Sequence, residues 1–290
     1  MPESADRTAP ALSGIEQVEA SVQRGHARHE LRARIAGVAY PIAVVLGTLV
    51  VWEVATRVFA VPAFLLPPPS TIGVSLVANA PLLLAHGWVT TVEILLGFAL
   101  SVIVGIPLAL AIFLWPAFSR SILPLLVSSQ AMPKVAVAPL LLVWFGFGLL
   151  PKVLIAFLIA FFPIVINTAV GLASIEPEKI HLARSMGFSA TATFFKIRLP
   201  SALPATFGGL KISITLAVVG AVVGEFVGGD AGLGYLLMVA NGSMDTALLF
   251  AGLVALTVLG IVLYLLVELA ERIAIPRHII AGGKEAHESL

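Results

Sequence analysis

The chain has 290 residues, of which 59% are hydrophobic and 11% are charged, and its net charge is +1. Its mean hydropathy is +1.05. About a quarter of the residues of a soluble domain are charged, so this composition excludes a water-soluble globule of this size. The near-neutral charge gives no indication of a nucleic-acid partner. The absence of cysteine excludes disulfides, thiolate metal sites and cysteine nucleophiles.

Apolar stretches long enough to cross a membrane follow one another along the chain. A span needs about 20 residues, and it must be helical because lipid offers no hydrogen-bond partners to the backbone. The expected spans are 35–58, 89–114, 122–145, 152–173, 205–227 and 247–267. We therefore expect an all-α membrane protein with six transmembrane helices. Its parts are a cytoplasmic tail at 1–34, a transmembrane domain at 35–272 and a cytoplasmic tail at 273–290.

The distribution of Lys and Arg predicts the orientation of these spans. Basic residues stand in the N-terminal tail (Arg7, Arg24, Arg28, Arg32, Arg34), in the loop after the fourth span (Lys179, Arg184, Lys196, Arg198) and near the C-terminus (Arg272, Arg277, Lys284). Cytoplasmic loops carry the excess of basic residues, so both termini are expected in the cytoplasm. The segments 60–88 and 228–246 are then external. The first apolar stretch is too long for a cleaved signal peptide and is expected to remain as an anchor.

The loop at 174–203 contains signals for two short helices outside the membrane. Pro177, flanked by two glutamates, predicts a helix start. Gly187 predicts the end of that helix, because glycine adopts left-handed dihedrals readily. Ser189 is expected to cap a second short helix that ends before Pro200.

Three apolar residues of this loop, Leu182, Met186 and Phe188, are unusual for a cytoplasmic surface. They indicate either a docking surface for another protein or a loop that packs on itself and stops at Gly187. The residues of the loop by themselves do not separate these alternatives.

The same loop resembles the pattern E-A-A-x3-G-x9-I-x-L-P of the inner-membrane permeases of binding-protein-dependent ATP-binding-cassette (ABC) importers. The residues that match are Gly187, Ile197, Leu199, Pro200 and Ala183, which is the second alanine. The pattern's glutamate is replaced by a histidine and its first alanine by a leucine.

Further segments extend the resemblance to residues 60–275. These segments are LPPPSTI at 66–72, TVEILLGFALSVIVGIPLALAI at 91–112, AMPKVAVAPLLLVWFGFG at 131–148 and VVGEFVGGDAGLGYLL at 222–237. They look like the branch of the family that transports nitrate, sulfonates and taurine, which also includes permeases for pyrimidine vitamin precursors.

The resemblance implies the permease fold of type I ABC importers, in the bacterial inner membrane. It implies that two permease copies, expected as a homodimer, form the pore and that each binds one cytoplasmic ATPase. A periplasmic or lipid-anchored solute-binding protein would deliver a small solute, either a sulfonate-, nitrate- or taurine-like anion or an aromatic vitamin precursor, for import by alternating access. The contact with the ATPase is expected at a coupling helix formed by His181, Leu182, Ala183, Arg184, Ser185, Met186, Gly187 and Phe188.

The chain lacks the G-x4-G-K-[ST] phosphate-binding loop, so it is not expected to hydrolyse ATP or to bind a cofactor. ATP and Mg²⁺ would bind to the partner ATPase, and no cluster of residues has the spacing of a metal site. The alternative from another class is a gradient-driven transporter or channel, for which Glu225 or Glu93 would be the essential acid. A membrane scaffold without transport would leave the loop pattern unexplained.

Charged residues inside spans indicate a pathway or an ion pair. Glu53 and Arg57 have the spacing of an i,i+4 pair. Glu93 is expected near the outer surface, where it could extend to the interface. Lys134 stands between two prolines in an interrupted span, where it could attract an anion, pair with Glu225 or bind a helix carbonyl terminus.

Other polar and small residues are candidates for the translocation path or its gate. Glu225 is expected to line the path or gate, and Asn167 could do so or make a helix–helix hydrogen bond. Gly232 and Gly234 belong to a glycine-rich external segment at 228–234, which by resemblance forms a gate and could equally be a tight turn into a helix at 235–240. Four glycines of the fifth span would allow close packing, in a dimer seam or within one chain: Gly208, Gly209, Gly220 and Gly224.

Overall fold

The computed structural model describes residues 39–40 and 42–275, and the regular structure of these residues is entirely helical. The chain divides into two units, one up to Ser70 and one from Thr71 onward. The first unit is helical at residues 39–40 and 42–58, within the expected first span. The start of that span at 35–38 lies outside the described residues, as do the tail at 1–34 and most of the tail at 273–290.

An ion pair and two hydrogen bonds organise the first unit. Arg57 Nε donates to Glu53 Oε1 over 2.7 Å, which confirms the predicted i,i+4 pair. The same carboxylate accepts from the backbone N–H of Ser70 over 2.9 Å and from the Ser70 hydroxyl over 2.8 Å. Glu53 therefore joins the end of the first helix to Ser70, the last residue of the same unit; the helix α2 spans Pro69–Ala78.

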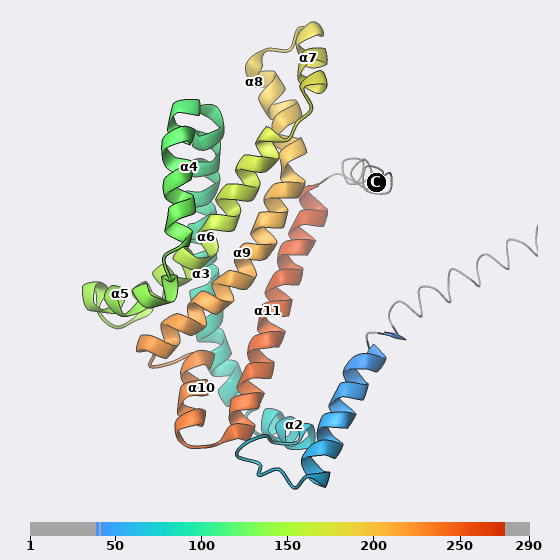
Figure 1. Ribbon diagram of the computed structural model, residues 1–290, viewed down its shortest axis with the longest axis vertical. Coiled ribbons are helices and arrows are strands. Elements are labelled where there is room, and N and C mark those ends of the chain that lie inside the picture. The colour runs from blue at the N-terminus through green and yellow to red at the C-terminus, as the bar shows by residue number, and fades with distance from the viewer. Residues whose placement is uncertain (1–38, 41, 276–290) are drawn as a thin grey trace, which may run out of the picture. The chain divides into compact units, whose positions relative to one another are not determined.

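The second unit is built from long helices that lie side by side. Its elements are α3 (Ala80–Leu114), α4 (Pro116–Gln130), η1 (Lys134–Val137), α5 (Ala138–Phe145), α6 (Leu149–Ala173), α7 (Pro177–Ser185), α8 (Ala190–Thr193), η2 (Phe194–Arg198), α9 (Leu199–Gly228), α10 (Leu233–Gly242) and α11 (Thr246–Ala274). The helix α6 packs mainly against α3 and α9, and α11 packs against α9. The short helices α7 and α8 lie at one end of this group, and α10 lies at the other (Figure 1).

Within the described residues, four helices are long and apolar enough to cross a membrane: α3, α6, the run Ala190–Gly228 and α11. The expected third span is bent by 86° between α4 and η1, so it is a broken span or a re-entrant segment. Pro133 at the break cannot continue the hydrogen-bond ladder of α4, which explains the bend. The protein is thus an all-helical membrane protein, and its described residues contain four or five candidate spans. The count of six spans stays a prediction.

The prediction that the second loop helix ends before Pro200 is wrong. Ser189 does cap α8, since its hydroxyl accepts from Ala192 N over 3.2 Å. The chain then continues through the π-helical turn η2 directly into α9. Leu199 N donates to the carbonyl of Phe194, five residues earlier, so the wider turn absorbs the hydrogen bond that Pro200 cannot donate.

Three of the four glycines predicted to allow close packing do so within the chain, against α6. A Cβ atom at Gly220 would lie 2.5 Å from Ala156 Cα, and one at Gly209 would lie 2.8 Å from the Pro163 carbonyl oxygen. One at Gly224 would lie 3.0 Å from Lys152 Cα. A Cβ atom at Gly208 would meet nothing within 4 Å.

We expect Gly220→Ala to lower the free energy of unfolding by about 1–3 kcal/mol, because the added methyl group forces α6 and α9 apart. The change is measured by equilibrium unfolding of the purified protein in mixed detergent micelles. Gly208→Ala on the same helix is the matched control, and it should be neutral or stabilising by up to about 1 kcal/mol, since alanine favours helix. Equal effects of the two substitutions would contradict the α6–α9 contact.

Candidate functional site

The predicted coupling loop has the expected first helix. The helix α7 begins at Pro177 after Glu176, and the chain turns at Gly187, whose φ is +83°. Ile180 and Ala183 are buried, whereas Leu182 and Met186 are 62% and 66% exposed. Residues four apart lie on one face of a helix, so Leu182 and Met186 form a single exposed apolar face.

The other residues assigned to the coupling helix are divided between surface and interior. His181, Arg184 and Ser185 are exposed, and the Ser185 hydroxyl donates to the Leu182 carbonyl over 2.8 Å. Phe188 is half-buried, and the Lys196 ammonium lies 5.5 Å from the centre of its ring. The structure therefore separates Phe188 from the exposed face of α7.

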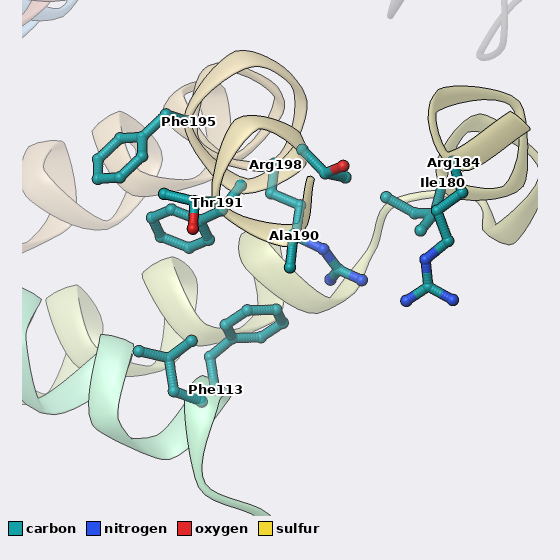
Figure 2. Close-up of a pocket in the computed structure, with 10 residues that line it drawn as sticks. Phe113, Ile180, Arg184, Ala190, Thr191, Phe195 and Arg198 are labelled. Atoms are coloured by element: carbon teal, nitrogen blue, oxygen red, sulfur yellow. The ribbon is translucent and has the colours of Figure 1, made fainter. Parts of the chain in front are cut away.

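A cavity of about 560 Å³ lies between α7, the α8–η2 segment and the C-terminal end of α3 (Figure 2). The Arg198 guanidinium lies 5.0 Å from the centre of the Phe113 ring, and its Nη1 donates to the Leu172 carbonyl over 3.4 Å. These contacts attach the loop to α3 and α6. In the sequence, Arg198 is only one of the basic residues that predict the orientation of the spans. Phe113 cannot be distinguished there from the other apolar residues of its span.

At the opposite end, an ion pair is buried between α3 and α6. Lys152 Nζ lies 3.0 Å from Glu93 Oε1, and the two side chains are 3% and 1% exposed. The carboxylate of Asp230, itself 92% exposed, lies 3.6 Å from the same ammonium. The expectation that Glu93 extends to the outer interface is wrong, because α3 begins at Ala80 and places Glu93 inside the helix, facing α6.

Sequence reasoning also missed Lys152, which reads as a residue at the membrane edge because it opens an apolar stretch. A charged residue at the same depth on a neighbouring span, here Glu93, was the signal that could have identified the pair.

Lys134 does not pair with Glu225, so that alternative is wrong. Its Nζ donates to Gln130 Oε1 over 2.7 Å and lies 5.9 Å from the centre of the Phe162 ring. Lys134 thus bridges the break between α4 and η1.

Asn167 lies between α6 and α9. Its Nδ2 donates to the Pro163 carbonyl of its own helix over 2.9 Å, and its side chain packs against Gly209. The hydrogen bond is therefore made within α6 rather than between helices.

Glu225 is 1% exposed and is bonded at the start of α10. Its Oε1 accepts from the Thr90 hydroxyl over 2.6 Å, and its Oε2 accepts from the Gly234 N–H. Gly232, with φ of +113°, is the N-cap of α10, so the glycine-rich segment does form a tight turn into a helix. His86 and Thr90 complete this contact, and sequence reasoning assigned no role to either.

Within residues 39–40 and 42–275, no group of three His, Asp or Glu residues could hold a metal ion. The arrangement instead connects both ends of the helix group to short segments outside it. At one end the loop of α7 and α8 is attached through Arg198, and at the other α10 is attached through Glu225 and Thr90.

We expect Lys152→Met to lower the stability of the protein by about 3–5 kcal/mol, because it leaves the Glu93 carboxylate buried without a counter-charge. The double variant Glu93→Gln/Lys152→Met removes both charges and should recover most of the loss. The measurement is a double-mutant cycle of unfolding free energies in detergent micelles. A double variant as unstable as Lys152→Met would contradict the pairing.

Comparison with known families gives a match over residues 97–278. The matching family is described as the binding-protein-dependent transport system inner membrane component.

Curated relatives cover most of the chain. The riboflavin transport system permease RibX of Chloroflexus aurantiacus is 40% identical over 229 residues, which are 78% of this chain and 85% of the relative. The formylaminopyrimidine transport permease ThiX of Halalkalibacterium halodurans is 36% identical over 79% of this chain and 91% of its own. The taurine transport system permease TauC of Escherichia coli is 28% identical over 80% of this chain and 89% of its own.

Among solved structures, a chain of the MetNI methionine ABC transporter in an inward-facing conformation has a similar fold. The TM-score is 0.60 at 19% identity, covering 69% of this chain and 99% of the other. A likeness at this identity supports the fold alone.

Proteins of the matched family are the multi-pass membrane components of ABC importers, which work with binding proteins and take their energy from separate ATPase subunits. The alternative of a gradient-driven transporter is therefore set aside. The chain belongs to the family of binding-protein-dependent transport system inner membrane components, as a non-catalytic permease subunit of an ABC importer.

Proposed function

We propose that this chain imports a small solute by alternating access, with the ATPase of the importer docked on α7. The observation that carries the proposal is the exposed apolar face of Leu182 and Met186 at the cytoplasmic end expected from the distribution of charge. Two large apolar side chains exposed on one face of a cytoplasmic loop fit a surface that a partner covers. The docking segment runs from His181 to Phe188, and ATP and Mg²⁺ bind to the ATPase rather than to this chain.

The docking segment is suited to transmit force. Gly187 turns the chain sharply after α7, and a Cβ atom there would meet no other group within 4 Å, which leaves room for a partner to approach. Arg198 attaches the loop to the inner ends of α3 and α6. Movement of α7 is therefore passed to several spans together.

The proposed topology has six spans with both termini in the cytoplasm. Its parts are the tail at 1–34, the transmembrane domain at 35–272 with the coupling loop at 174–203, and the tail at 273–290. The positions of α7 and α10 at opposite ends of the long helices support this orientation (Figure 1). The external segments 60–88 and 228–246 would receive the periplasmic or lipid-anchored solute-binding protein.

The proposed pore lies between two copies of this chain, each with its own ATPase. The break between α4 and η1 supports this assembly. It exposes Gln130 and the residues up to Pro133, and irregular backbone at membrane depth is tolerated against protein or water but not against lipid. Lys134 at this break would line the translocation path. Glu225, Gly232 and Gly234 would belong to the external gate, and Asn167 to the packing beside the path.

The proposed solute is either a sulfonate-, nitrate- or taurine-like anion or an aromatic vitamin precursor. Relatives named for riboflavin, formylaminopyrimidine and taurine support both classes. The variant Lys134→Gln separates them in proteoliposomes that contain the complete importer. Removal of the ammonium should raise the KM for an anionic solute and leave the KM for an uncharged heterocycle unchanged.

We expect Leu182→Asp to weaken binding of the ATPase by about 2 kcal/mol, or about thirtyfold in Kd, because a carboxylate would be buried in an apolar contact. Gly187→Trp should have a similar effect, since a bulky residue is placed at a left-handed position. Binding is measured between the purified permease in lipid nanodiscs and its candidate ATPase, together with ATP hydrolysis.

Ser121→Asp is the matched control, because it adds the same charge to an exposed residue at the inner end of α4. It should leave ATPase binding unchanged. If Leu182→Asp and Ser121→Asp bind the ATPase equally well, the assignment of α7 as the docking helix is wrong.

A further inference from the structure

The N-terminus of α10 is held by side chains of two other helices. Gly232 N donates to His86 Nδ1 over 3.0 Å, and Leu233 N donates to the Thr90 hydroxyl over 2.8 Å. Gly234 N donates to the Glu225 carboxylate. The first N–H groups of a helix have no partner within it, and here three successive groups are satisfied by α3 and α9. We call these three side chains and the backbone at 232–234 the outer joint.

The outer joint is closely packed. Thr90 and Glu225 are 0% and 1% exposed. The Thr90 hydroxyl donates to Glu225 Oε1 over 2.6 Å while accepting from Leu233 N, so one hydroxyl connects α3, α9 and α10. A Cβ atom at Gly232 would collide with the Glu225 carboxyl group, and one at Gly234 would lie 2.7 Å from Glu225 Oε2. Both glycines are therefore required by the close approach of Glu225.

A second contact between α3 and α10 lies beside the outer joint. The rings of His86 and Tyr235 are stacked with their centres 6.1 Å apart. The helix α10 is thus attached to α3 by backbone bonds and by a side-chain contact.

The helix that carries Glu225 also carries the coupling loop. The run Ala190–Gly228 is helical over 39 residues, which corresponds to a length of about 58 Å at a rise of about 1.5 Å per residue. Its first turn is α8, capped by Ser189, and Glu225 lies in its last turn. A displacement of α8 therefore reaches Glu225 through one continuous helix that passes along α6.

We propose that the outer joint makes α10 move with α9, so that motion of the coupling loop at the inner end is converted into motion of the external segment. This inference rests on the proposed docking of an ATPase at α7. Thr90 and His86 act as positioning residues. Thr90 contacts α10 and Glu225, His86 contacts α10, and neither need touch the solute. The joint would thereby link ATP binding inside to the opening of the outer gate.

The test uses a reporter on α10 in the complete importer. The chain has no cysteine, and Met238 on α10 is 49% exposed, so Met238→Cys introduces a single thiol. Its rate of labelling by a membrane-impermeant maleimide is compared between the nucleotide-free complex and the complex trapped with ATP and vanadate. We expect the rate to differ between these states in the parent, to become the same in the Thr90→Val background, and to differ again in Thr90→Ser, which restores the hydroxyl.

Association with the ATPase should persist in the Thr90→Val background, unlike in Leu182→Asp, so failure of the joint is distinguished from failure of docking. A Thr90→Val importer whose labelling still follows the nucleotide state as in the parent would overturn the proposal, and so would a parent whose labelling does not change. If Thr90→Val does not yield a folded complex, His86→Ala decides the question. It removes the bond to Gly232 N and the stacking on Tyr235 while leaving Thr90 in place, so it should reduce the difference between states. An undiminished difference would again overturn the proposal.

Discussion

The close contact between α6 and α9 is the constraint on which the rest of the described structure depends. In lipid, helices gain little from burying apolar side chains, so association relies on close packing of small residues and on polar contacts. Gly220 against Ala156 and Gly209 against Pro163 bring the two backbones together along most of their length. Because α6 and α9 are joined by the loop of α7 and α8, this contact also determines where the loop emerges. It places Lys152 and Glu225 near the same end of the helix pair.

The buried polar groups at that end lie against one another. Lys152 is paired with Glu93, and Glu225 receives hydrogen bonds from Thr90 and from the start of α10. An unpaired charge at this depth would cost several kcal/mol. The arrangement of α3, α6, α9 and α10 at this end is therefore specified by these polar contacts as well as by packing.

The end that carries the loop of α7 and α8 instead exposes an apolar face. Leu182 and Met186 project from α7, while Ile180 and Ala183 hold the helix to the protein. The Arg198 guanidinium attaches the segment to α3 and α6. In the proposed importer, this combination of an exposed apolar face and firm attachment would pass the motion of the ATPase to the spans. The continuous helix from α8 to Gly228 then connects that end to the outer joint.

The sequence by itself determined the helical membrane class, the family and the ranges of most spans, because these depend on hydropathy and on local spacing. It also determined the start of α7 at Pro177 and the left-handed turn at Gly187, because these depend on the geometry of proline and glycine. Those properties depend on residues that are close together in the chain. Only the tertiary structure decided that the third expected span is bent by 86° and that η2 carries α8 into α9. It also decided that Glu93 pairs with Lys152 and that Lys134 does not reach Glu225. The partners of a buried charge come from different helices, and which residues meet depends on the rotation and depth of each helix, which hydropathy does not encode.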